Sequence, residues 1–185
     1  MLTMDGQGYR HWARTPAGTR IYAIGDLHGR LDLLDEMHEL VQADAVSADG
    51  ARIVVVYLGD YIDRGPCSQE LLNRLLNQPL AASEAVYLRG NHEDIMLEFM
   101  DLGTRGPQWL RHGGRETLES YGVTAPDRGA EADFTAAQAA LRAALPARHR
   151  AFLDATQLSH REGDYLFVHA GIKPGVEIAA QDSND

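Results

Sequence analysis

The sequence predicts an α/β fold in which the strands of a sheet alternate with helices. Three stretches rich in β-branched and aromatic residues, at 20–24, 52–58 and 84–88, are each followed by a glycine-containing loop and a helical pattern. Three strand–loop–helix units in succession favour a layered core with right-handed crossovers. A length of 185 residues suits one domain with a buried core, so we expect residues 1–185 to form a single domain.

The first unit consists of a strand at 20–24, which stops at Gly25, and a helix that begins after Gly29. Apolar residues in this helix recur at steps of three and four, which predicts one buried face. The residues of this predicted face are Leu33, Leu34, Met37, Leu40 and Val41.

The second unit is a strand at 52–58 followed by a helix at 68–77. This strand shows no polar alternation, as expected for a strand that is covered on both faces. The third unit pairs a strand at 84–88 with a helix from Asn91. Active sites of such folds collect at the carboxyl ends of the strands, so the loops there are the first place to look for functional residues.

The rest of the chain is less regular. Between 101 and 133, Gly and Pro residues separate short helical pieces such as 116–121. Two further helices are predicted at 134–145 and 146–156. A fourth strand, at 165–168, ends at His169.

Composition excludes several classes of protein. Seventeen Lys and Arg residues against 27 Asp and Glu residues give a formal net charge of -10, so no nucleic-acid partner is expected. The single Cys67 cannot form an internal disulfide, which favours a reducing compartment. The first residues lack the apolar core of a signal peptide, and no apolar run approaches the roughly 20 residues that span a bilayer. We therefore expect a cytoplasmic protein without a membrane partner.

Polar residues gather where the predicted strands end, always beside glycines. A sheet would bring these carboxylates, amide and imidazoles to one edge, and mixed carboxylate and imidazole ligands suit Mn²⁺, Zn²⁺ and Fe²⁺. Taken singly, each cluster has a structural explanation as a turn or a helix N-cap, but four of them in order favour a metal site. The clusters are GDLHG at 25–29, GDYIDRG at 59–65, RGNHE at 89–93 and HAG at 169–171.

These four blocks resemble the signature of the metal-dependent phosphoprotein phosphatase family, and in particular bacterial serine/threonine protein phosphatases within the calcineurin-like metallophosphoesterases. The match runs from Ile21 to Gly171. It implies a metallophosphoesterase-type sandwich of two mixed β-sheets flanked by helices. It also implies removal of phosphate from phosphoserine or phosphothreonine proteins by direct attack of a metal-bridging hydroxide, with two divalent ions, Mn²⁺ first and Fe or Zn as alternatives.

The resemblance also assigns a role to each matching residue. His92 would be the general acid and Asp63 the carboxylate that orients it, which agrees with the need of an imidazole acid for a raised pKa. Arg64 and Arg89 would bind the substrate phosphate, as suits a bidentate guanidinium. The metal ligands would be Asp26, His28 and Asp60 for the first ion, and Asp60, Asn91 and His169 for the second, with Asp60 bridging.

The sequence departs from the family after the HAG block. The family continues with a second arginine and a Gly-His block, whereas here no Gly-His pair follows His169 before Asp185. We therefore expect a domain that is truncated at its C-terminus, with a complete first metal site and a weakened second one. The other histidines are expected to be surface or helix residues: His11, His38, His112, His149 and His160.

Several questions remain open at this point, and one of them is whether phosphotyrosine is also a substrate. A diadenosine polyphosphate hydrolase is an alternative because such enzymes resemble the same blocks, and a catalytically silent metal-binding protein is an alternative because of the truncation. The segment 103–122, with Trp109 and three arginines, could form a basic lip for a phosphorylated substrate or a structural cap, and we favour the cap. No pattern in the sequence indicates an oligomeric state.

Overall fold

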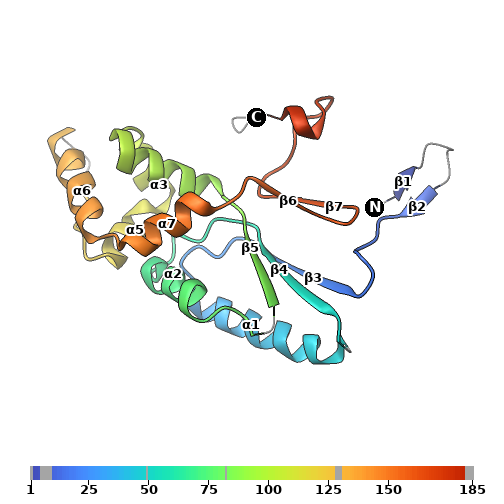
Figure 1. The fold of residues 1–185 in the computed structure, drawn as a ribbon. Coiled ribbons are helices and arrows are strands. Elements are labelled where there is room, and N and C mark those ends of the chain that lie inside the picture. Colours follow the sequence, from blue (N-terminus) through green and yellow to red (C-terminus); the bar gives the residue numbers. More distant parts are fainter. Residues whose placement is uncertain (1, 5–9, 49, 82, 128–130, 182–185) are drawn as a thin grey trace.

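The computed structural model describes residues 2–4, 10–48, 50–81, 83–127 and 131–181, and its centre is a parallel sheet (Figure 1). The strands are β3 (Thr19–Ile24), β4 (Arg52–Tyr57) and β5 (Ser83–Tyr87), in the order β3-β4-β5. Helices α1 (Leu31–Ala45) and α2 (Ser68–Asn77) make the crossovers that parallel pairing requires. The three predicted strand–loop–helix units are confirmed, with boundaries that shift by one or two residues.

The two faces of the sheet are covered by different layers, and β4 shows this residue by residue. Val55 and Tyr57 belong to the large core that includes residues of α1 and α2. Val54 and Val56 face the other way, where Phe167 packs against them. All four side chains are fully buried, which explains why the predicted strand lacks polar alternation.

Helix α1 is buried along a narrower face than the sequence predicts. Leu34 and Val41 are buried as expected, and they share their face with His38. The side chains of Leu33, Met37 and Leu40 were predicted to be buried, but they are 47%, 41% and 65% exposed. The prediction was wrong because it counted only the spacing of apolar residues, whereas the buried face includes His38, whose Nε2 makes a 2.7 Å hydrogen bond with Tyr57.

The remaining helices pack beside the carboxyl edge of the sheet (Figure 1). Helix α3 (Asn91–Leu102) starts directly after β5. It is followed by the short helix α4 (Gly106–Trp109), a π-helical turn η2 (Leu110–Gly114) and α5 (Arg115–Ser120), and later by α6 (Glu131–Ala144) and α7 (Ala147–Ala155). His149 lies on α7 and is buried.

The second layer is an antiparallel hairpin of β6 (Ser159–Glu162) and β7 (Tyr165–Val168). Strand β6 was not predicted, because SHRE lacks a strand-like apolar pattern. Shorter elements are the antiparallel pair β1 (Leu2–Met4) and β2 (Arg10–Trp12), and the 3-10 turns η1 (Val46–Ala48) and η3 (Ile178–Ala180).

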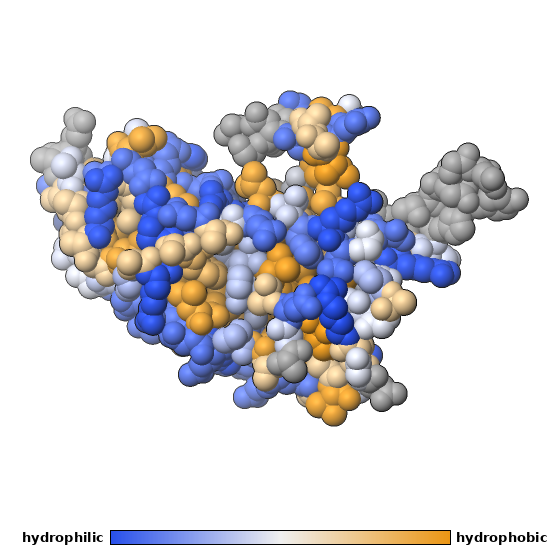
Figure 2. Space-filling model, in the orientation of Figure 1, coloured by the Kyte–Doolittle hydropathy of each residue, from blue (hydrophilic) through white to orange (hydrophobic). Residues whose placement is uncertain are grey.

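The α/β class with two sheet layers and flanking helices is confirmed. Within the described residues the central sheet is wholly parallel and the facing hairpin antiparallel. The surface in Figure 2 intersperses hydrophilic and apolar residues, and apolar atoms are visible on the C-terminal segment above the hairpin, where Ile172 and Ile178 are about half exposed. Among the described helices, none has both the length and the apolar character needed to cross a bilayer.

Candidate metal centre

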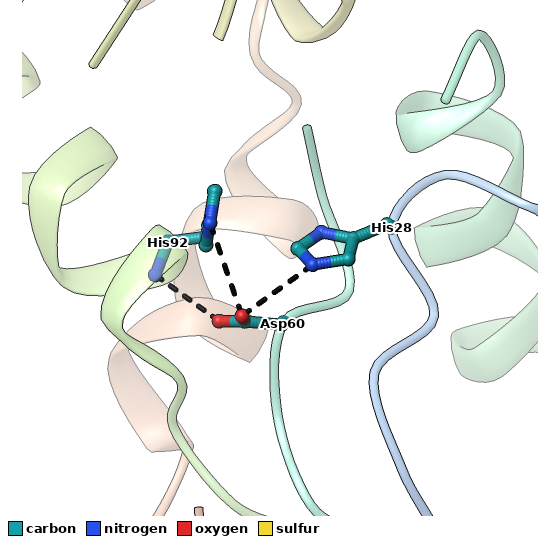
Figure 3. A group of neighbouring side chains, drawn as sticks. All are labelled: His28, Asp60 and His92. Atoms are coloured by element: carbon teal, nitrogen blue, oxygen red, sulfur yellow. Dashed lines mark hydrogen bonds and ion pairs between the residues drawn. The ribbon is translucent and has the colours of Figure 1, made fainter. Parts of the chain in front are cut away.

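The carboxyl ends of the strands bring the predicted ligands together around Asp60. In Figure 3 the Asp60 carboxylate lies between the imidazoles of His28 and His92. Its Oδ2 is 3.6 Å from His28 Nε2 and 3.9 Å from His92 Nε2, and its Oδ1 is 3.4 Å from His169 Nε2. The Asp60 side chain is only 4% exposed. One buried carboxylate therefore faces three imidazoles, two from loops and one from the first turn of α3.

The loops are tied together by backbone contacts. The carbonyl of Asp60 accepts hydrogen bonds from the amides of Leu27 and His28, at 3.0 and 2.8 Å. Gly90 lies so close to Asp60 that a Cβ at that position would collide with its carboxylate. The glycine of the RGNHE block is therefore required by the close approach of two ligand loops.

Two of the imidazoles are held in the tautomer that a metal ligand needs. His28 Nδ1 donates to the carbonyl of Ile62, and His169 Nδ1 donates to the carbonyl of Leu58, both at 2.9 Å. A carbonyl can only accept, so each Nε2 presents a lone pair when the imidazole is neutral. His169 Nε2 lies 3.1 Å from Asn91 Oδ1, which places two acceptor atoms side by side when the imidazole is neutral. This set of electron pairs suits a cation.

The ligand atoms form two groups that share Asp60. One contains His28, Asp60 and His92, and the other contains Asp26, Asp60 and His169. The predicted sets joined Asp26 to His28, and these residues are also close, with 3.8 Å between Asp26 Oδ2 and His28 Nε2. The donors fit two divalent ions that share Asp60, and the assignment of ligands to each ion stays a prediction.

Glu93 braces the two loops on either side of Asp60. Its carboxylate is fully buried and accepts hydrogen bonds from the amides of Asp60, Tyr61 and Gly90, at 2.9, 2.8 and 2.9 Å. Burial and the nearby Asp60 raise the pKa of Glu93 to about 7, and the three amide bonds oppose that rise. Glu93 is also near the N-terminus of α3, as the N-cap interpretation of the RGNHE block expected. Its hydrogen bonds, however, connect the loop of Asp60 with the loop of Gly90.

His92 differs from the other two imidazoles because its Nδ1 is bonded to a carboxylate. The distance from Nδ1 to Asp63 Oδ2 is 2.6 Å, and both side chains are buried. Burial alone would lower the pKa of His92, but the hydrogen bond to Asp63 and the charges of Asp63 and Asp60 outweigh it and raise the pKa. Burial raises the pKa of Asp63, and its hydrogen bonds oppose that rise.

The two predicted phosphate-binding arginines have different surroundings. Arg64 lies over the site, where its guanidinium nitrogens are 2.8 and 3.1 Å from Nε2 of His28 and of His92. The guanidinium of Arg89 is instead committed to the end of α7, where it donates to Thr156 Oγ1 and to the carbonyls of Leu153 and Asp154. Phosphate binding by either residue stays a prediction, and this geometry favours Arg64.

Backbone strain is concentrated at the same loops. Non-glycine residues seldom adopt positive φ, at a cost of order 1–3 kcal/mol each. Five do so within the described ranges, and Arg105 is the one outside the site. The other four are His28 (42°), Asp60 (53°), Asp63 (73°) and Arg64 (66°). The loops therefore hold their side chains at the expense of local backbone energy.

Two side chains of the site were missed from the sequence. Trp109 Nε1 and Thr117 Oγ1 both donate to the Asp63 carboxylate. They belong to the segment 103–122 that was interpreted as a cap over the core. Arg115 of this segment donates to the carbonyl of Pro126, which fits a structural role. The only sequence signal was a tryptophan and a Gly-Gly pair in a region of irregular pattern.

On the other side of Asp60, the site opens into a cavity of about 580 Å³. Its polar lining includes Asn91, His169 and Arg89. Its apolar lining includes Leu158, Ile172 and Ile178, each about half exposed.

Known proteins share this arrangement of sequence and fold. The model of the family described as calcineurin-like phosphoesterase matches residues 19–183. Serine/threonine-protein phosphatase 2 of Escherichia coli (strain K12) is 39% identical over 112 residues, which are 60% of this chain and 42% of that protein. The symmetrical bis(5'-nucleosyl)-tetraphosphatase of Aromatoleum aromaticum is 32% identical over 155 residues, which are 84% of this chain and 45% of that protein.

A solved structure provisionally assigned as a diadenosine tetraphosphatase has the same fold, with a TM-score of 0.55 at 18% identity over 94% of this chain and 61% of that one. The chain spans less than half the length of the two named relatives. The family uses a dinuclear metal centre, and the donors around Asp60 fit such a centre. The resemblance inferred from the four sequence blocks is confirmed, and the chain belongs to the calcineurin-like phosphoesterase family.

Proposed function

We propose that this chain is a phosphomonoesterase that acts on phosphoserine and phosphothreonine in proteins and uses two divalent ions, with Mn²⁺ as the first choice. The observation that carries the proposal is the His92–Asp63 pair. The Nε2 of His92 faces the ligands around Asp60, while its Nδ1 is bonded to a buried carboxylate. The relative named serine/threonine-protein phosphatase 2 supports this substrate class.

The three imidazoles divide into two chemical roles. His28 and His169 donate their Nδ1–H to backbone carbonyls, which leaves Nε2 directed at the cluster around Asp60 and favours a ligand role. His92 donates to a carboxylate, which favours the imidazolium and a role in proton transfer. His28 and His169 would hold the ions together with Asp26, Asp60 and Asn91. When bound, two divalent ions supply a nucleophilic water near neutral pH and neutralise the phosphoryl oxygens.

In the proposed reaction, water supplies the new oxygen on phosphorus and the ester P–O bond breaks with its electron pair on the leaving oxygen. His92 donates its Nε2 proton to that oxygen, and Asp63 stabilises the imidazolium before transfer. Arg64 would bind the non-bridging oxygens, because its guanidinium already lies within 3.1 Å of the Nε2 atoms of His28 and His92.

Replacing the proton donor tests this assignment. We expect His92→Asn to lower kcat on a phosphoserine peptide by about 10²–10⁴-fold, the usual contribution of a general acid. Mn²⁺ binding, measured by calorimetry, should be retained. His112→Asn is the matched control, since His112 is exposed on the η2 turn.

Three other results would change the assignment. Unchanged turnover by His92→Asn would reject the acid role, and loss of Mn²⁺ binding would make His92 a ligand, as its grouping with His28 and Asp60 allows. A wild-type chain that binds Mn²⁺ but hydrolyses no phosphoester would support the catalytically silent alternative.

A dinucleoside tetraphosphatase is the second candidate, because the relative with that name aligns with 84% of this chain. Mn²⁺-dependent kcat/KM should be compared for a phosphoserine peptide and diadenosine tetraphosphate. We expect the phosphopeptide to be preferred. Strict preference for the dinucleotide would replace the first candidate with the second.

A further inference from the structure

The carboxylate of Asp63 is enclosed by donors from the α4–α5 segment, which the chemistry described above does not use. Its Oδ2 accepts from His92 Nδ1 at 2.6 Å and from Trp109 Nε1 at 2.9 Å. Its Oδ1 accepts from Thr117 Oγ1 at 2.6 Å. Asp63, Trp109 and Thr117 are all 0% exposed, so these hydrogen bonds replace those that water would otherwise make. From this enclosure we propose that Trp109 and Thr117 are positioning residues for proton transfer by His92.

The hydroxyl of Thr117 holds both the side chain and the backbone of Asp63. It has one hydrogen, which points to Asp63 Oδ1. The same oxygen accepts the amide of Asp63 at 2.9 Å, and Ser68 Oγ, 3.0 Å away, is then the donor to Thr117. The amide of Asp63 is also 3.2 Å from Ser68 Oγ. Because Asp63 has φ of 73°, these contacts help to maintain a backbone conformation that is otherwise unfavourable.

The indole of Trp109 is itself fixed in place. It packs against Phe99 with 5.2 Å between ring centroids. Gly114 also lies against the indole, and a Cβ at that position would be only 2.5 Å from the ring. No side chain fits at position 114 without moving Trp109, so the glycine allows the indole N–H to reach Asp63.

The same segment also holds the neighbour of Asp63. The amide of Arg64, which has φ of 66°, donates to the carbonyl of Gly113 at 3.0 Å. The segment from Trp109 to Thr117 therefore fixes Asp63 through its side chain and Arg64 through its backbone. It lies more than 40 positions along the chain from the loop that it holds.

These contacts predict an effect on the proton transfer rather than on substrate or metal binding. If Asp63 loses a donor, its carboxylate can rotate away from His92, and the imidazolium is then less well aligned. This inference rests on the proposed role of His92 as an acid. Loss of alignment should therefore slow esters with poor leaving groups, which need a proton, more than esters with good ones.

Conservative variants test the two donors separately. Thr117→Val keeps the shape and removes the hydroxyl, Thr117→Ser keeps the hydroxyl, and Trp109→Phe keeps an aromatic ring without the N–H. We expect Thr117→Val and Trp109→Phe to lower kcat on a phosphoserine peptide about 10-fold, less than loss of the acid itself. KM and Mn²⁺ affinity should change less than twofold, and Thr117→Ser should restore most of kcat.

Two controls separate positioning from a general defect. On p-nitrophenyl phosphate, whose leaving group needs little protonation, Thr117→Val and Trp109→Phe should lose less than threefold. The exposed residues Thr104 and Trp12 provide matched variants, Thr104→Val and Trp12→Phe, that should behave as wild type. Equal losses on both substrates, or a Thr117→Ser variant as slow as Thr117→Val, would overturn the inference.

A spectroscopic measurement decides the question without turnover. In ¹⁵N-labelled metal-free protein, the Nδ1–H resonance of His92 reports its hydrogen bond to Asp63. Thr117→Val and Trp109→Phe should shift this resonance, and Thr117→Ser should leave it near the wild-type position. An unmoved resonance would reject the positioning role. If the two variants shift this resonance but the wild-type chain has no phosphatase activity, the positioning role is upheld and the proposed function is rejected.

Discussion

The two sides of the site around Asp60 differ in burial and in the number of partners that each functional side chain has. On the closed side, Asp63 and its donors Trp109 and Thr117 are 0% exposed, and His92 is 2% exposed. On the open side, the Asp26 side chain is 54% exposed, and Asn91 is exposed beside the cavity that reaches His169.

The difference shows which functional groups need hydrogen-bond partners supplied by the protein and which can rely on water. A buried carboxylate must find all its hydrogen-bond donors within the protein, so the closed side requires a network built from distant segments. The exposed side chains predicted as ligands on the open side are in contact with water, so the affinity of a cation there would depend on ligand charge and geometry more than on enclosure. The closed side is therefore suited to a fixed proton donor, and the open side to groups that bind from solution.

The largest expected effect comes from the carboxylate that both sides share. Asp60→Asn should weaken Mn²⁺ binding at both ions by more than about 100-fold, since loss of a ligand exceeds the 10–100-fold typical of its hydrogen-bond partners. Asparagine tolerates positive φ, and its oxygen can still accept the amide of His92, so the fold should persist. Calorimetric titration with Mn²⁺ measures the loss.

Asp154→Asn is the matched control, because Asp154 is exposed and its carboxylate pairs with Arg150. It should bind Mn²⁺ as the wild type does. If Asp60→Asn lost one ion and kept the other at wild-type affinity, Asp60 would belong to one side of the site instead of joining both.

A smaller effect should distinguish the Mn²⁺ affinities of the two predicted sites. The predicted first set has two carboxylates, Asp26 and Asp60, whereas the second shares Asp60 and adds only neutral ligands, Asn91 and His169. Ligand charge tunes the affinity of a cation, so we expect Mn²⁺ to bind in two steps that differ at least about 10-fold. Asn91→Ala should weaken only the second step.

Asn77→Ala, at the exposed end of α2, is the control for the loss of an amide side chain. Two equally tight Mn²⁺ sites in this chain would contradict the expected weakness of the second site. A first step weakened by Asn91→Ala would show that the ligands are divided in another way, as the grouping of Asp26 with His169 permits.

The sequence was informative where chemistry and local pattern coincide. Asp26, Asp60 and Asn91 each follow the end of a parallel strand and stand beside a glycine. The structure brings these strand ends together. Contacts of this kind follow from topology, because the carboxyl ends of neighbouring parallel strands must lie at one edge of the sheet.

The closed side could not be predicted in the same way. Trp109 and Thr117 reach Asp63 across 46 and 54 positions of the chain, from helices whose placement depends on tertiary packing. Strand β6 was missed because all four residues of its sequence, SHRE, are polar and give it no apolar face. Arg89 was assigned by its neighbours in the RGNHE block, yet its guanidinium extends to α7, and no local pattern encodes that direction.

The smallest expected effect on catalysis comes from His38, a buried residue of α1, because its replacement should change stability at low pH and leave the metal centre untouched. His38 is 2% exposed and bonded to Tyr57, the last residue of β4, and burial lowers the pKa of His38 from 6.5 to about 4. The unfolded chain takes up this proton at higher pH than the folded one. His38 therefore costs no stability above pH 6.5, and its penalty grows as the pH falls from 6.5 towards 4, up to about 3 kcal/mol.

His38→Gln removes this proton and can keep a hydrogen bond to Tyr57. The free energy of unfolding, measured by urea denaturation between pH 7 and 4, should fall less steeply in the variant than in the wild type. Mn²⁺ affinity and kcat at pH 7 should be the same in both, because the hydrogen-bond partner of His38 is Tyr57, which is none of the predicted ligands. Parallel stability curves would show that His38 is already accessible to protons in the folded chain, and a change in Mn²⁺ affinity would show that the position of Tyr57 controls the loop of Asp60.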